Sequence, residues 1–114
     1  MLTVEKLNAY GANTAEGLAR CFNKEDFYLR LVGMTLGDKN FDRLAGAVEA
    51  GDAKEAFEAC HALKGSTGNL ALTPIYEPVC ALTERLRGAS ALGDVGDLYD
   101  EIMTAAEDLR KLAD

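Results

Sequence analysis

The segment with the clearest chemical content surrounds the only histidine of the chain, His61. A neutral imidazole is an effective nucleophile near physiological pH and can form a covalent intermediate. Lys64 follows one helical turn later, where its charge disfavours the protonated imidazolium and attracts anionic oxygens. The pair could therefore support nucleophilic attack by an imidazole on an anionic group.

The positions of the neighbouring residues on a helix indicate that His61 faces solvent. With about 100° per residue, an apolar stripe falls on the side opposite the histidine: Ala56, Ala59, Leu63 and Leu70. The residues within about 60° of it include Lys54, Phe57, Lys64, Gly65 and Gly68. The histidine therefore shares an exposed face with cations, an aromatic ring and two glycines.

Two glycines one turn apart on an exposed helix face need a reason, because each costs about 1 kcal/mol relative to alanine. The functional interpretation is that Gly65 and Gly68 clear a path to the imidazole. The alternatives are a loosened helix end or the close crossing of another helix. Phe57 likewise has two interpretations, a residue that contacts a partner or a core residue turned toward a neighbouring helix.

The segment resembles the signature of the histidine phosphotransfer (HPt) family, His-x-x-Lys-Gly-Ser followed by small residues. The matching positions are His61, Leu63, Lys64, Gly65, Ser66, Asn69 and Leu70. The resemblance implies that His61 accepts a phosphoryl group, attacking the aspartyl phosphate of one receiver domain through Nε2 and passing the group to another. The same resemblance implies a carrier protein more than an enzyme.

The resemblance also implies roles for the neighbours of the histidine. Lys64 would supply charge for the phosphoryl oxygens and Gly65 access for the receiver domain, while Lys54 and Phe57 would contact the partner. Supporting roles are expected for Ser66 and Gly68. Thr83 and Glu84 are the nearest candidates for the polar residue that in several relatives reaches from the following helix to hold the imidazole.

The chain departs from the family pattern at two places, one of which is this polar residue of the following helix. Many members have a glycine shortly after the motif, where this chain has Ala71. We expect Gly68 to supply the missing backbone freedom.

The sequence contains no motif for binding a phosphate donor of its own. It has no G-x-x-x-x-G-K-[ST] loop, no nucleotide-binding glycine cluster and no acidic trio for magnesium. We expect no cofactor in this chain, with magnesium supplied by the partner receiver domain. The expected partners are response-regulator receiver domains and a hybrid histidine kinase. The alternatives are a non-phosphorylated helical adaptor or regulator of a two-component kinase, and a metal or thiol-redox protein built on the cysteines.

Helical periodicity and start and stop signals predict an all-α protein. The expected helices span residues 3–10, 14–22, 24–50, 52–72, 74–87 and 94–112. Asn13, Asn23 and Asp52 are the expected N-terminal caps of three of them. The long third helix, with Gly37 as the candidate position of a kink, would bury a stripe of Phe27, Leu31, Met34, Phe41, Ala45 and Val48. Short connections favour one domain over residues 1–114, an antiparallel up-down four-helix bundle with two short N-terminal helices capping one end.

The composition of the chain indicates which class of molecule it binds. The 114 residues are 48% hydrophobic, enough for one core, and carry a formal net charge of −7. Such acidity disfavours nucleic acid and anionic membranes as partners and discourages self-association, so we expect a monomer that binds proteins. The absence of long apolar runs and of a signal-like start predicts a cytoplasmic location. Cys21, Cys60 and Cys80 are expected to be reduced and buried, without a metal.

Overall fold

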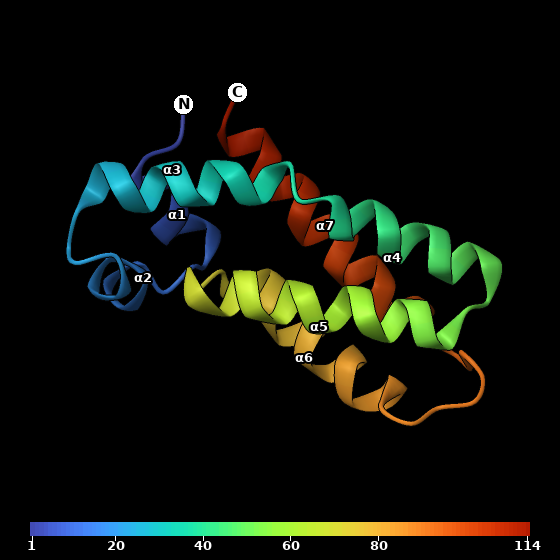
Figure 1. Ribbon diagram of the computed structural model, residues 1–114. Coiled ribbons are helices and arrows are strands. Elements are labelled where there is room, and N and C mark those ends of the chain that lie inside the picture. Colours follow the sequence, from blue (N-terminus) through green and yellow to red (C-terminus); the bar gives the residue numbers. More distant parts are fainter.

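The structure, a computed structural model, describes residues 1–114 and consists of α-helices without strands (Figure 1). Its all-helical class agrees with the class predicted from the sequence. No helix is both long and apolar enough to cross a membrane. The seven helices are α1 (Val4–Tyr10), α2 (Thr14–Arg20), α3 (Glu25–Leu36), α4 (Lys39–Ala50), α5 (Ala53–Asn69), α6 (Thr73–Leu86) and α7 (Gly96–Leu112).

The single helix predicted over residues 24–50 is wrong, because the chain breaks into α3 and α4. Gly37 ends α3, and Asp38 follows in an extended conformation with φ −64° and ψ 121°. The Asp38 carboxylate accepts a hydrogen bond from the backbone N–H of Asn40 at 2.8 Å. A side chain that caps a new helix competes with the continuous helix for backbone donors, which explains the break.

The core-facing stripe predicted for α3 is confirmed only in part, since Phe27 and Leu31 are partly buried and pack against the core but Met34 does not. Met34 is 67% exposed, and the buried residues of α3 are instead Tyr28, Val32 and Thr35. On α4 the buried residues are Phe41, Leu44 and Ala47. Because α3 and α4 are separate helices, the face of each is set by its own packing and not by one periodicity that runs across both.

Two of the three predicted side-chain caps are confirmed. The Asn13 side chain accepts a hydrogen bond from the backbone N–H of Glu16 at 3.2 Å, and Asp52 accepts one from Glu55 at 3.0 Å. The predicted cap at Asn23 is wrong, because Lys24 begins α3 without a side-chain cap. Phe22 and Asn23 both have left-handed backbone conformations, with φ of 58° and 56°, and α2 ends at Arg20 instead of residue 22.

The motif helix ends earlier than predicted. α5 stops at Asn69, and Ala71 adopts a left-handed conformation with φ 55°. This is the position where many family members have glycine, and a glycine adopts this conformation without steric cost. The expectation that Gly68 supplies the backbone freedom is therefore wrong, since the turn is made by Ala71 itself. α6 then begins at Thr73, one residue before the predicted start, with Pro74 in its first turn.

The helices pack mainly against their neighbours in sequence. α5 lies between α4 and α6, α6 packs against α7, and α1 contacts α7 (Figure 1). One continuous core of 23 buried residues joins the helices. The N-terminal amine donates to the carbonyl oxygen of Ala113 at 2.9 Å, so the two ends of the chain lie together.

Candidate functional site

His61 lies in the middle of α5 on its exposed face. The opposite face carries the predicted stripe, with Ala56, Ala59 and Leu63 fully buried. Packing of these residues against α4 and α6 fixes the rotation of α5 about its axis. The imidazole is thereby presented to solvent by a rigid helix.

An aromatic and a cationic side chain lie beside the histidine. The Phe57 ring stacks on the His61 imidazole, with centroids 6.0 Å apart and planes inclined by 14°. The guanidinium carbon of Arg87, just after α6, lies 5.4 Å from the centroid of the Phe57 ring. Arg87 is held in turn by Glu84, which accepts hydrogen bonds from Nη2 at 2.9 Å and Nε at 3.3 Å.

The Glu84 carboxylate is kept ionised by its surroundings. Its hydrogen bond with Arg87 and the charge of Arg87 lower the pKa of Glu84, and the charge of Lys64 acts in the same direction. Lys64 is half-buried on α5, one turn from the histidine. Lys64 and Arg87 therefore contribute positive charge to this side of the molecule, and Glu84 is paired with Arg87.

The two motif glycines have different surroundings. A Cβ atom added at Gly65 would meet nothing within 4 Å, whereas one at Gly68 would lie 2.8 Å from Cε1 of Tyr76. Gly65 therefore leaves open space beside His61. Gly68 instead permits the close approach of Tyr76 on α6, the helix-crossing alternative.

Ser66 points away from the histidine toward the junction of α3 and α4. Its hydroxyl lies 3.2 Å from the carbonyl oxygen of Leu63 and 3.5 Å from Oδ2 of Asp38. It lines a groove of about 340 Å³ together with Met34 and Asn69. The structure thus separates Ser66 from the His61 side of the helix.

Thr83 lies level with the histidine along the helix axis, but its hydroxyl does not contact the imidazole. Phe57 faces Arg87 and Gly68 faces Tyr76, so α5 and α6 run antiparallel in a register that puts Thr83 level with His61. Thr83 is nevertheless fully buried, and its hydroxyl donates to the carbonyl oxygen of Val79 at 2.7 Å. The candidate role of holding the imidazole is therefore not supported for Thr83.

The remaining predicted residues lie on the same side of the molecule. Lys54 is exposed in the first turn of α5 and forms no ion pair. Glu84 is exposed and holds Arg87 instead of the imidazole. Sequence reasoning missed Arg87, because nothing in its local sequence indicates that it meets Phe57. Only the register between α5 and α6 brings the two together.

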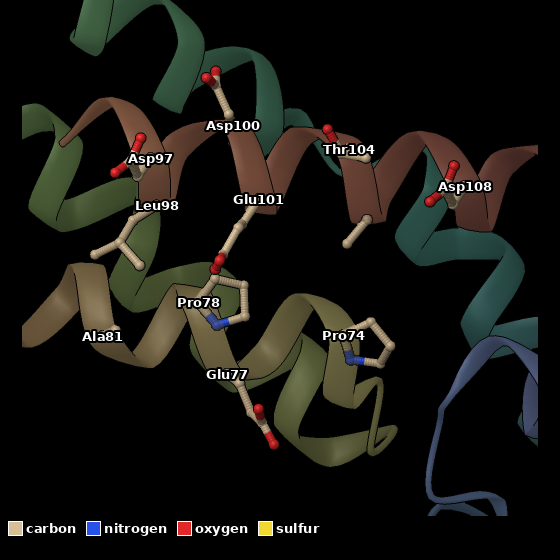
Figure 2. Close-up of a pocket in the computed structure, with 11 residues that line it drawn as sticks. Pro74, Glu77, Pro78, Ala81, Asp97, Leu98, Asp100, Glu101, Thr104 and Asp108 are labelled. Atoms are coloured by element: carbon tan, nitrogen blue, oxygen red, sulfur yellow. The ribbon is translucent and has the colours of Figure 1, made fainter.

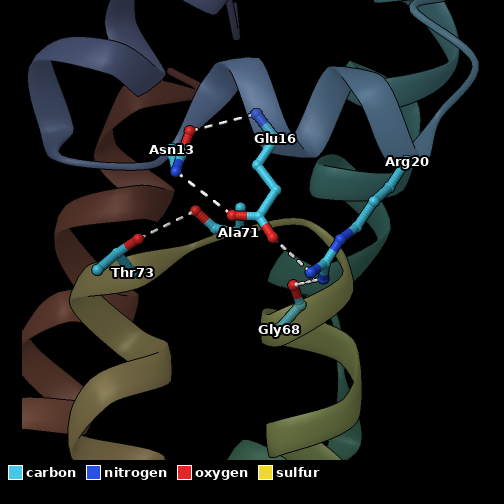
Figure 3. Close-up of polar contacts among 6 residues, drawn as sticks. All are labelled: Asn13, Glu16, Arg20, Gly68, Ala71 and Thr73. Atoms are coloured by element: carbon cyan, nitrogen blue, oxygen red, sulfur yellow. Dashed lines mark hydrogen bonds and ion pairs between the residues drawn. The ribbon is translucent and has the colours of Figure 1, made fainter.

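The C-terminal end of α5 is held by residues of α2, of its N-cap and of α3, and Figure 3 shows the contact of Arg20 with Gly68. Arg20 donates to the carbonyl oxygen of Gly68 at 2.6 Å. The backbone N–H of Asn13 donates to the carbonyl oxygen of Ala71 at 2.9 Å. Tyr28 donates from its hydroxyl to the carbonyl oxygen of Leu70 at 3.0 Å. The Gly68 carbonyl also accepts from the backbone N–H of Ala71 at 3.1 Å, so Arg20 adds a second bond to a carbonyl at the helix end. These bonds fix the end of the helix that carries the histidine.

The largest pocket lies elsewhere and contains no residue of α5. It has a volume of about 800 Å³ between α6 and α7 (Figure 2). Five carboxylates line it: Glu77, Asp97, Asp100, Glu101 and Asp108.

The cysteines do not form a site with the histidine. Cys21 and Cys60 are buried, Cys80 is half-buried, and all three are free. No group of three or more His, Cys, Asp or Glu side chains is arranged to hold a metal ion.

Comparison with known families decides the assignment that the motif suggested. The family model of the Hpt domain matches residues 35–112, well over half of the chain. The chain belongs to the Hpt domain family. Hpt domains carry phosphoryl groups on histidine in two-component phosphorelays, and they interact with receiver domains and kinases. They are phosphotransfer carriers and not enzymes in the usual sense. No curated protein and no solved structure gives a significant match.

The Hpt match begins near the end of α3. It therefore includes α4 to α7 and the histidine motif. The helices α1 and α2, with most of α3, lie before it. The residues that hold the end of α5, Arg20 among them, come from this preceding segment.

Proposed function

We propose that His61 is the phosphoryl acceptor of this Hpt domain and that it carries the group between response-regulator receiver domains. The observation that carries the proposal is the exposed imidazole beside the open space at Gly65. A receiver domain must bring an aspartyl phosphate into contact with the imidazole. An unobstructed helix face allows this approach.

The transfer requires only groups that the two partners supply. The lone pair of Nε2 attacks phosphorus, the bond from phosphorus to the aspartyl oxygen breaks, and the aspartate leaves as a carboxylate. Lys64, one turn away, attracts the phosphoryl oxygens during this exchange. The receiver domain contributes the aspartate and its magnesium ion.

The surface around His61 also suggests how the partner binds. Lys54 and Lys64 give this face positive charge within an acidic chain, and receiver domains surround their aspartate with acidic residues. Such complementarity accelerates encounter and orients the partner. We place a hybrid histidine kinase and a second response regulator at the two ends of the relay.

The proposed architecture treats α3 and α4 together as one arm. With α5, α6 and α7 this arm completes the antiparallel bundle, and α1 and α2 cap one end. The contacts of α5 with α4 and α6, and of α6 with α7, support this arrangement.

The test is transfer of labelled phosphate from a phosphorylated receiver domain to the wild-type protein and to His61→Gln. We expect acid-labile phosphate on the wild type and none on the variant, with unchanged circular dichroism, because the side chain lies opposite the core. Uptake of acid-labile phosphate by the variant would identify another acceptor. Binding of the receiver without any uptake by the wild type would instead support an adaptor.

A further inference from the structure

We propose that Phe57 is a positioning residue that fixes the orientation of the His61 imidazole, and that Arg87 and Glu84 hold the Phe57 ring in place. The inference deepens the proposed function and rests on it. Phe57 precedes His61 by one helical turn, so their side chains are neighbours on one face. The two rings are nearly parallel and lie within the distance range of interacting aromatic pairs.

The imidazole needs such a contact because no hydrogen bond holds it. Its nearest candidate from the following helix, Thr83, is buried and donates to its own helix. Glu84 is engaged with Arg87. Without the stacked ring, the exposed His61 side chain would be free to rotate among its staggered conformations. Contact with Phe57 restricts that freedom.

The Phe57 ring can hold the imidazole because it is itself held on two sides. Its body is half-buried and packs against the hydrophobic core. Arg87 lies over the ring, and a cation at this distance is attracted to the π-electrons. The two hydrogen bonds from Arg87 to Glu84 fix the guanidinium. A reactive group is positioned well only when its supporting side chains are locked in this way.

This role differs from direct contact with a partner, the role that the sequence predicted for Phe57. A docking residue affects only transfer from a receiver domain. A positioning residue affects attack on any phosphoryl donor, because the imidazole must reach the same geometry each time. A small donor without a protein surface separates the two roles.

The experiment compares phosphorylation by phosphoramidate and by a phosphorylated receiver domain. With phosphoramidate, the imidazole nitrogen bonds to phosphorus, the phosphorus–nitrogen bond of the donor breaks, and ammonia leaves. Phe57→Leu removes the ring and retains apolar bulk, whereas Phe57→Tyr retains the ring. We expect Phe57→Leu to slow both reactions by a similar factor, about 3-fold to 30-fold. Phe57→Tyr should restore both rates to within about twofold of wild type.

The same pair of donors defines the results that overturn the proposal. Slower transfer from the receiver domain alone would make Phe57 a docking residue. Unchanged rates with both donors would show that the ring has no role. If the wild type accepts phosphate from neither donor, the proposed function fails, which is a separate result from any ranking of the variants.

A spectroscopic readout tests the contact itself without phosphorylation. Because His61 is the only histidine, its two carbon-bound ring protons give unique NMR signals. The Phe57 ring current should displace them, Phe57→Leu should remove the displacement, and Phe57→Tyr should retain it. Arg87→Gln should reduce it, since Phe57 then loses its cation. Signals that do not differ between wild type and Phe57→Leu, at matched denaturant midpoints, would contradict the stacked arrangement.

Discussion

The Lys64 ammonium group can interact with two anionic groups, the Glu84 carboxylate and a phosphoryl group. Its charge lowers the pKa of Glu84 in the resting protein, and the same charge is available to a phosphoryl group on the neighbouring His61. A cation placed before the reaction begins needs no reorganisation when negative charge arrives, which makes it effective in transfer. Under the proposed function we therefore expect Lys64 to have a larger effect on transfer than cations distant from the histidine.

Lys64→Gln should therefore slow phosphoryl transfer from a receiver domain by at least about tenfold, with little change in stability. Lys111→Gln is the matched control, because it removes the same charge from an exposed position on α7. Rates measured by rapid quench should fall for the first variant only. Equal losses in both would mean that net charge, and not position, governs the rate.

Gly65 offers a second test, because a larger residue there should stabilise the helix and yet slow phosphoryl transfer. Gly65→Ala should stabilise the protein by up to about 1 kcal/mol, because nothing lies within 4 Å of the added Cβ. Gly46→Ala, an equally open glycine in the middle of α4, should give a similar gain. Denaturant midpoints of the two variants measure both effects.

Gly65→Leu should retain the fold and block transfer from a receiver domain, because the larger side chain fills the space beside the imidazole. A protein that is stable but slow in transfer would support this space as the approach route. Loss of about 1–3 kcal/mol of stability would instead mean that Gly65 permits close packing within the bundle.

The short helix α2 packs against the C-terminal end of the motif helix α5. Gly17 in α2 is packed so closely that an added Cβ would lie 2.5 Å from Cε1 of Tyr28 and 2.8 Å from the carbonyl oxygen of Leu70. That carbonyl follows directly after α5. The packing of α2 and the end of α5 therefore depend on one another.

Gly17→Ala should destabilise the protein by roughly 1–3 kcal/mol, although alanine is the better helix former, because the added methyl group overpacks a filled site. Gly46→Ala again serves as control, with the opposite sign. The denaturant midpoint gives the stability, and amide exchange at the C-terminal end of α5 should accelerate. A stabilised Gly17→Ala variant would mean that α2 does not dock as described.

The folded protein buries a thiol and two tyrosine hydroxyls, and it is stabilised only while these groups remain protonated. Burial raises the pKa of Cys60 from its ordinary value of 9.0 to about 12, and burial also raises the pKa of Tyr10 and Tyr28. Above pH 9 the unfolded chain releases these protons before the folded protein does. Stability conferred by the protonated groups is thus complete below pH 9 and is lost as the pH rises toward 12.

We expect the free energy of unfolding to fall by roughly 1–2 kcal/mol between pH 8 and pH 10. In Cys60→Ala the fall should be smaller, because the largest contributor in that range is gone. The difference between the two pH values is compared within each protein, so the packing cost of the substitution cancels. An identical pH dependence in both proteins would exclude Cys60 as the cause.

The acidic surface and the complete core also predict a monomer, since one continuous core already buries the apolar faces of the helices. Sedimentation should give a single species over a wide range of protein concentration. A stable dimer that covers His61 would be incompatible with an open face for the receiver domain.

The sequence by itself determined the features that depend on neighbours within one or two turns. The caps at Asn13 and Asp52, and the buried stripe of α5 with His61 opposite, follow from residue types at fixed helical spacing. Local spacing is sufficient there because a helix repeats every 3.6 residues whatever surrounds it. The family motif could be recognised for the same reason, since its residues from His61 to Asn69 lie within one helix.

Only the tertiary structure decided which residues meet across helices. Gly65 and Gly68 look equivalent in sequence, yet only Gly68 faces the ring of Tyr76. Arg87 reaches Phe57 because α5 and α6 pack in one particular register, and the rotation of α3 that exposes Met34 is likewise set by packing. Such contacts depend on how entire helices fill a shared core, and no short stretch of sequence encodes that information.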